Sequence, residues 1–174
     1  MILESNFTVL RPMQASDVPL LAKWLLDPHN KQWLQLSEDP PEYCTIESVR
    51  ERFERMKASE AIEIWRVETR EGRPIGQIEL VDIRPLHGRA EMHMCIGEHD
   101  QQSKGLGYDA LKRLLRRTFE DLKLSRVFCT VDADNPRAIR CYEKAGFARE
   151  GLLRKHRRRH GRPVDMLMMG IVVG

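Results

Sequence analysis

The strongest constraint on the fold is a change in hydrophobic periodicity near Gly97. Upstream of it, three segments alternate apolar and polar residues as strands do: Ala61–Glu68, Pro74–Ile83 and Ala90–Gly97. Downstream of Gly105, apolar residues recur at the spacing of one helix face: Leu111, Leu114, Leu115, Phe119 and Leu122. A chain with both periods needs a mixed architecture, in which an antiparallel meander precedes strand–helix units.

The N-terminal part supplies one strand and two helices. We predict a strand at Phe7–Arg11, a helix that starts at Ser16-Asp17, and a loop over residues 27–44 that is rich in Pro, Asn and Asp. Thr45 is expected to cap the second helix.

The C-terminal part continues with a strand at Leu124–Val131 and a helix at Pro136–Ala145, which Gly146 ends. Arg149–Met166 is interpreted as a strand and a basic turn, and a last strand runs through Val173. The predicted fold is therefore α+β, a mixed and mostly antiparallel twisted sheet of about seven strands flanked by helices. We expect a single domain that spans residues 1–174.

The amino-acid composition limits the class of protein and the cellular location that we expect for the chain. With 41% hydrophobic and 32% charged residues, the chain resembles a globular protein that buries a core without metals or disulfides. It has no apolar run near the roughly 20 residues of a membrane helix, and Met1–Arg11 lacks the features of a secretory signal. We therefore expect a cytoplasmic protein without a metal site. Its cysteines, none in a C-x-x-C pair, are expected to be reduced packing residues: Cys44, Cys95, Cys129 and Cys141.

A glycine turn at residues 102–108, Gln-Ser-Lys-Gly-Leu-Gly-Tyr, separates a predicted strand from a helix. A helix N-terminus offers unpaired N–H groups and a positive dipole end, and glycine lets a phosphate approach the backbone. The segment therefore predicts a phosphate site, with Lys104 available for added charge. A simple turn into the helix is the alternative interpretation.

A dinucleotide-binding site is a more specific alternative interpretation of the same glycine turn. Gly105, Gly107 and Ala110 satisfy G-x-G-x-x-A, and Asp132 follows at roughly the distance of a ribose-binding acid. However, a polar loop separates the preceding strand from the turn, whereas a dinucleotide turn follows its strand tightly. Too few residues remain for the second half of a doubly wound sheet, so we disfavour this interpretation.

Two motifs give the chain a family resemblance. Asn135–Phe147 resembles the second motif of the GNAT superfamily of N-acyltransferases, and Gln102-x-x-Gly105-x-Gly107 matches its first motif, Q/R-x-x-G-x-G/A. The motifs occur in the family's order and spacing. The sequence looks most like bacterial spermidine and diamine N-acetyltransferases. This resemblance implies a GNAT-like sheet with a splayed strand pair, and transfer of acetyl from acetyl-CoA to a primary amine.

The resemblance also assigns a binding role to individual residues. Coenzyme A would lie between Ala90–Gly97 and Leu124–Val131, which splay apart. Main-chain N–H groups near Cys95 and Ile96 would face the thioester carbonyl, and Asn135 would contact the cofactor arm. The pyrophosphate would be bound by the main chain of Gln102, Ser103, Lys104, Gly105, Leu106, Gly107 and Tyr108.

One catalytic role follows from the same resemblance, and a second is inferred from the chemistry of the acceptor. Tyr142 would act as a general acid that protonates the departing thiolate, although a packed aromatic is the plain alternative. Asn135 before Pro136 is likewise an ordinary N-cap. The acceptor amine must lose a proton before it attacks, and Glu91 is the first candidate for the general base, with Glu79 second. Both glutamates could equally be exposed residues of the strand alternation. Direct attack needs no protein nucleophile, so no cysteine is expected to carry the acyl group.

The sequence leaves three classes of acceptor amine open: a polyamine, an aminoglycoside and a protein N-terminus. A polyamine needs carboxylates, for which the candidates are Glu38, Asp39, Glu42 and Glu47. A basic cluster instead suits an acidic protein, a phosphorylated acceptor or an oligomer contact, such as that of a homodimer: Arg154, Lys155, Arg157, Arg158, Arg159 and Arg162. Thr130 stands where one N-terminal acetyltransferase group has a catalytic glutamate. This difference weakens the interpretation that the acceptor is a protein N-terminus.

Two non-catalytic interpretations remain. An acyl-CoA sensor would keep Gln102–Gly107 and show no turnover with any amine. A nucleic-acid-binding module would use Arg154–Arg162, but that segment lacks interleaved aromatics and no helix-turn-helix or RNP pattern accompanies it. We therefore expect a small-molecule or protein amine as the partner, and neither a membrane nor a nucleic acid.

Overall fold

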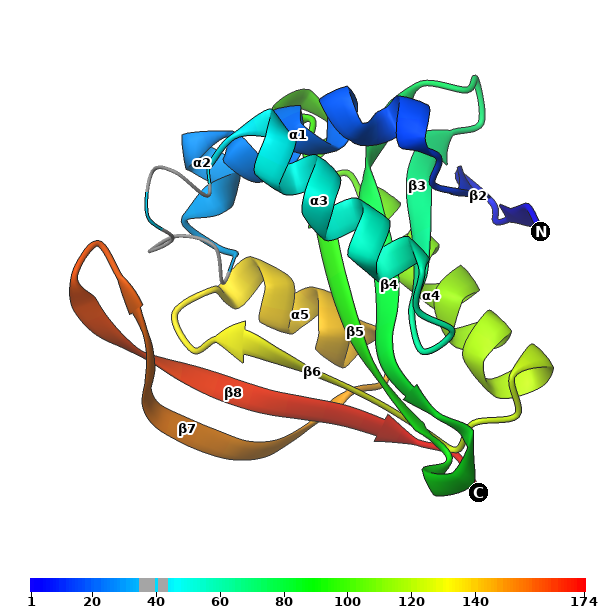
Figure 1. Cartoon of the computed structure of the whole chain (residues 1–174). Helices are drawn as coiled ribbons and strands as arrows, with labels where there is room; N and C mark the ends of the chain where they lie inside the picture. The colour runs from blue at the N-terminus through cyan, green and yellow to red at the C-terminus, as the bar shows by residue number, and fades with distance from the viewer. Residues whose placement is uncertain (35–39, 41–43) are drawn as a thin grey trace.

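The computed structural model describes residues 1–34, 40 and 44–174, which form one sheet with helices on both faces (Figure 1). Its strands are β1 (Leu3–Glu4), β2 (Thr8–Pro12), β3 (Glu63–Thr69), β4 (Pro74–Arg84), β5 (Arg89–Ile96), β6 (Arg126–Asp132), β7 (Ala148–Arg159) and β8 (Arg162–Val172). Its α-helices are α1 (Val18–Leu26), α2 (Pro28–Lys31), α3 (Ile46–Lys57), α4 (Leu106–Arg116) and α5 (Pro136–Lys144). The predicted α+β fold is confirmed, and the strand beyond the expected number is the two-residue β1.

The segment predicted as a loop, residues 27–44, contains the short helix α2. Asp27 Oδ1 accepts a hydrogen bond from the Asn30 amide at 2.9 Å, and Pro28 occupies the first turn. An Asp cap followed by proline is a helix-start signal that the polar composition of the segment concealed. The loop prediction is therefore wrong for Pro28–Lys31.

The sheet order is β1-β2-β3-β4-β5-β6-β8-β7, and among the described strands β5 and β6 are the parallel neighbours. They pair only from Arg89–Arg126 to Glu91–Phe128. Beyond Glu91, β5 continues along β4 whereas β6 continues along β8, so the two strands separate (Figure 1). The splayed strand pair that the resemblance implied is thus present.

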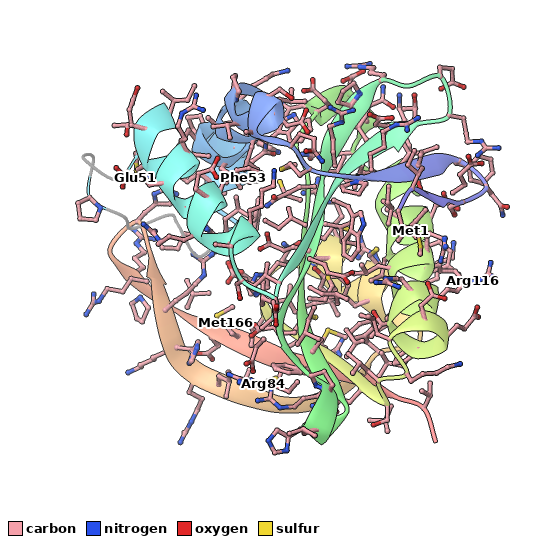
Figure 2. The ribbon with its side chains drawn as sticks, turned by 45° about the vertical axis from the view of Figure 1, so that its right-hand side comes forward. Met1, Glu51, Phe53, Arg84, Arg116 and Met166 are labelled. Carbon is pink, nitrogen blue, oxygen red and sulfur yellow. The ribbon has the colours of Figure 1, made fainter. Side chains whose placement is uncertain are left out.

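Helices cover the two faces of the sheet separately (Figure 1). Helices α4 and α5 pack on one face, where Leu111 and Ile139 join the main core. Helices α1 and α3 pack on the other face around a second core that contains Trp24 and Phe53. Figure 2 shows Phe53 on the sheet side of α3 and Glu51, which is exposed, on the outer side. Because successive strand residues alternate between faces, each strand of the splayed pair presents side chains to both layers.

Local signals set the helix ends. Thr45 Oγ1 accepts a hydrogen bond from the Ser48 amide at 3.1 Å, which confirms the predicted cap of α3. Gly146 follows α5 with a φ of 101°, a conformation that suits glycine at a helix end. None of the helices in the described ranges combines the length and apolarity needed to cross a membrane.

Candidate acetyl-transfer site

A cavity of about 440 Å³ opens where β5 and β6 separate. Its lining joins the predicted phosphate loop to side chains of α3, β4, β5, β6 and α5. Met166 of β8 contributes to it and can be located on the sheet in Figure 2. The volume is typical of a site for a small ligand or cofactor.

The loop between β5 and α4 has the backbone of an anion site. Ser103 has a φ of 60° and Gly105 a φ of 82°, so both are left-handed, on either side of Lys104. Gly105 is the N-cap of α4, whose first-turn N–H groups have no intrahelical acceptors. Left-handed turn residues beside a helix N-terminus form a concavity of N–H donors that suits a phosphate. Ser103, Gly105 and Gly107 line the cavity.

The N-terminal half of α5 forms another wall. Asn135 Oδ1 accepts a hydrogen bond from the Ala138 amide at 3.1 Å, so the predicted N-cap is confirmed. Asn135 and Tyr142 both line the cavity and are largely buried, and the Tyr142 ring lies 5.8 Å from that of Phe147. Burial raises the pKa of Tyr142 well above its ordinary value. The phenol therefore keeps its proton at neutral pH.

A histidine that was not predicted from the sequence lies between the two candidate bases. His93 Nδ1 is 3.0 Å from Glu79 Oε1, and His93 Nε2 is 3.0 Å from Glu91 Oε1. Burial lowers the pKa of His93, but hydrogen bonds and charge from Glu79 and Glu91 outweigh it and raise the pKa to about 9. Of the two carboxylates, Glu79 lines the cavity and Glu91 does not.

Comparison with known proteins agrees with this geometry. Residues 8–148 match the acetyltransferase (GNAT) domain family. The chain belongs to the GNAT family. It is 30% identical over 135 residues to a spermidine N(1)-acetyltransferase of Vibrio cholerae, covering 78% of this chain and 76% of that relative. It is also 30% identical over 162 residues to an aminoglycoside N(6′)-acetyltransferase type 1 of Klebsiella pneumoniae, covering 86% and 79%.

The fold supports the same assignment. A crystal structure of the V. cholerae spermidine N-acetyltransferase in complex with CoA and spermine superposes with a TM-score of 0.86. The two are 25% identical, and the match covers 95% of each chain. This GNAT chain is therefore an N-acetyltransferase, and the dinucleotide interpretation of its glycine turn is wrong, because the sheet is mostly antiparallel and not doubly wound.

In this GNAT site Gln102 positions the loop from within. Its Nε2 donates to the Ile96 carbonyl at 2.8 Å and to Asn30 Oδ1 at 3.0 Å, and its Oε1 accepts from Arg137 Nη1 at 2.6 Å. Its amide donates to the His99 carbonyl at 3.2 Å. These hydrogen bonds connect Gln102 to Ile96, His99 and Asn30, and its expected contact with the pyrophosphate stays a prediction.

The cysteines of this GNAT chain fit a mechanism without an acyl-enzyme. Cys95 and Cys129 are buried, and Cys95, Cys129 and Cys141 form no disulfide. Burial raises the pKa of all three thiols, for Cys95 to about 12. The thiolate needed for nucleophilic catalysis is therefore scarce near neutral pH.

The basic cluster forms a hairpin, β7–β8, whose arginines divide between two environments. Arg157 Nε donates to Asp132 Oδ1 at 2.7 Å, and its Nη2 contacts the other oxygen. The same guanidinium donates to the carbonyls of Gln32 at 2.8 Å and Leu34 at 3.0 Å. Arg157 therefore joins the hairpin to β6 and to the residues that follow α2, of which Leu34 lines the cavity.

Arg159 has a similar inward role. Its Nη1 lies 2.9 Å from Asp132 Oδ2, its Nη2 contacts Asp134, and its guanidinium lies 4.8 Å from the centre of the Trp33 ring. Arg154, Lys155 and Arg162 are exposed. The cluster is therefore divided between exposed residues and two inward arginines, whose charges Asp132 and Asp134 balance.

The structure gives little support to the carboxylates that were predicted to bind a polyamine. Glu38, Asp39 and Glu42 lie outside the described residues. Glu47 is exposed in the first turn of α3 and does not line the cavity.

Proposed function

We infer that this N-acetyltransferase carries the acetyl group of acetyl-CoA to a primary amine of a small polycation, a polyamine in the first instance. One observation supports this most directly. A cavity bordered by an anion-binding helix start contains a proton donor, Tyr142, and a buried carboxylate, Glu79. Those three parts are what amine acetylation from a thioester requires.

The lining fits coenzyme A. Gly105 has a left-handed backbone that other residues rarely adopt, and it lines the cavity together with Ser103 and Gly107. The pyrophosphate would be held by main-chain N–H groups of Ser103, Lys104, Gly105, Leu106, Gly107 and Tyr108. The pantetheine arm would follow the open edge of β5 near Cys95 and Ile96, with Asn135 opposite. Bound there, acetyl-CoA supplies the acetyl group as a thioester.

Two residues would move protons. An amine with a pKa of about 10.4 loses its proton at pH 7 at a cost of about 4–5 kcal/mol, which a positioned carboxylate reduces. Glu79 is the better-placed base because it lines the cavity, whereas Glu91 meets only the outer nitrogen of His93. Tyr142, protonated at neutral pH, would donate to the departing sulfur.

The charges of the following residues around the site are compatible with binding of a polyamine. Glu79 and Glu91 balance His93 and Arg52, whose Nη2 is 3.9 Å from Glu79. Arg157 and Arg159 are likewise matched by Asp132 and Asp134. The hairpin therefore presents little unpaired positive charge toward the cavity through these two arginines. An aminoglycoside, also a polycation, is the second candidate because the K. pneumoniae relative covers more of this chain.

The oligomeric state of this chain is a separate prediction. A structure of the V. cholerae spermidine N-acetyltransferase is dodecameric. We expect this chain to form a homo-oligomer, of which a homodimer is the smallest form. Light scattering of the purified protein would measure it.

An amine panel tests the proposed function. Acetyl-CoA is mixed with the protein and with spermidine, spermine, kanamycin or a peptide with a free N-terminus, and free thiol is measured. We expect turnover with spermidine and spermine. Faster turnover with kanamycin would move the acceptor to aminoglycosides, and binding of coenzyme A without turnover of any amine would contradict the proposal.

Reversing the charge at Lys104 is expected to weaken binding of the co-substrate. Lys104→Glu puts a carboxylate beside the proposed pyrophosphate site, so KM for acetyl-CoA should rise about ten-fold with kcat nearly unchanged. The effect should shrink at high salt, because Lys104 is exposed. Lys123→Glu, which makes the same change in the exposed turn beyond α4, is the control and should leave KM unchanged. Equal KM values in the two variants would count against this phosphate site.

A further inference from the structure

Three ionisable side chains meet across β4 and β5. Glu79 and His93 are direct partners in the strand register, and Glu91 lies two positions before His93 on the same face. Both ring nitrogens lie 3.0 Å from a carboxylate oxygen. An imidazole can donate at both nitrogens only when it carries both protons, so this geometry selects the cationic form of His93.

The two carboxylates differ in burial. The side chain of Glu79 is 3% exposed, whereas that of Glu91 is 25% exposed. The cavity-lining carboxylate is therefore the one most shielded from water. A buried carboxylate without a cation tends to take up a proton, which would remove its ability to act as a base.

The elements around His93 offer few other charges. Helix α3 supplies Arg52, which lies 3.9 Å from Glu79 Oε1, too far for a strong hydrogen bond. Strand β6 supplies the uncharged Thr130 to the cavity, and its Asp132 is held by arginines of the β7–β8 hairpin. Among the described residues, His93 is thus the closest cation to Glu79.

We propose that His93 is the positioning residue of the catalytic base: hydrogen-bonded to Glu91 on one side, it places a positive charge beside Glu79 and keeps this carboxylate directed at the acceptor amine. This inference rests on the proposed role of Glu79. In the step itself, the ammonium loses one proton to Glu79 and its lone pair forms the C–N bond as the C–S bond breaks. The second nitrogen proton passes to the Tyr142 oxygen and replaces the one that Tyr142 gives to sulfur, and Glu79 then releases the first proton to water. His93 neither gains nor loses a proton.

Replacing His93 with glutamine tests the charge while keeping a hydrogen-bonding side chain. In His93→Gln, kcat at pH 7 should fall about ten-fold with KM for acetyl-CoA unchanged. The acid limb of the pH–rate profile should move to higher pH, so the deficit against wild type should shrink as pH rises. A merely structural role would lower the rate by the same factor at every pH. His87→Gln, in the exposed turn before β5, is the matched control and should keep the wild-type profile.

Two comparisons separate this inference from the proposed function. If Glu79→Gln keeps wild-type activity, the base is elsewhere and the role of His93 is lost with it. If Glu79→Gln loses activity at all pH values but His93→Gln keeps the wild-type profile, only the role of His93 is overturned.

A measurement on the wild-type protein covers the case in which His93→Gln does not fold. The ring of His93 is titrated by NMR, with the His87→Gln and Glu79→Gln variants for assignment. We expect both nitrogens protonated at pH 7, a pKa near 9, and a lower pKa in Glu79→Gln. Because the folded pKa lies above the ordinary 6.5, the stabilisation from protonated His93 is complete below pH 6.5 and lost as pH rises through 9. Titration of His93 near pH 6.5 would overturn the proposal.

Discussion

Tyr142→Phe is expected to lower kcat about 100-fold while leaving the affinity for coenzyme A nearly unchanged, because it removes a proton donor and keeps the ring. The ring packs against Phe147 and is largely buried, so phenylalanine fills the same space. Burial raises the pKa of the hydroxyl, so it stays protonated throughout the useful pH range and can donate as charge develops on sulfur. Steady-state thiol release and a coenzyme A titration measure the two quantities.

Phe147→Leu is the control that separates packing from chemistry. It loosens the contact with Tyr142 but keeps the hydroxyl, so it should cost about 1 kcal/mol of stability and leave kcat within a few-fold of wild type. If Tyr142→Phe turned over amines at the wild-type rate, the hydroxyl would have no part in the reaction. If both variants lost activity to the same extent, Tyr142 would act through packing.

Much of the fold could be predicted because its signals are local. Alternation marked the meander, apolar residues at the spacing of one helix face marked α4, and Asn135-Pro136 marked the start of α5. The two glycines of the loop and the left-handed Ser103 lie where the phosphate loop was predicted. The short helix α2 was missed because four residues give no periodicity, so only its cap could reveal it.

The centre of the site could not be predicted in the same way. Glu79 and His93 meet only because of the register of β4 and β5, and the turn Pro85–His87 with an irregular pairing near Val81 hides that register from the sequence. With a regular hairpin, the period of two would have placed His93 with the two glutamates. Likewise, a run of arginines gives no indication of which members turn inward until acids such as Asp132 are located.

Arg157→Ala is expected to destabilise the protein by about 3 kcal/mol, since it leaves a buried carboxylate without its main partner. The side chain of Asp132 is 2% exposed and that of Arg157 10% exposed, so water compensates little for the lost contact. The variant also frees the carbonyls of Gln32 and Leu34, and Leu34 lines the cavity in which we propose that the acceptor binds. We therefore also expect a higher KM for the amine, with KM for acetyl-CoA unchanged. Urea unfolding and steady-state kinetics measure these effects.

Arg154→Ala provides the matched control on the same hairpin. Arg154 is exposed, so its removal should change the free energy of unfolding by less than about 0.5 kcal/mol and leave both KM values unchanged. Adding Asp132→Asn to Arg157→Ala should cost less than the two single changes together, because the first change has already broken the shared contact. If Arg157→Ala were as stable as Arg154→Ala, the arginine would not join the hairpin to β6. The division of the basic cluster into anchoring and exposed arginines would then have to be abandoned, and with it the argument that a polycation can approach this side of the cavity.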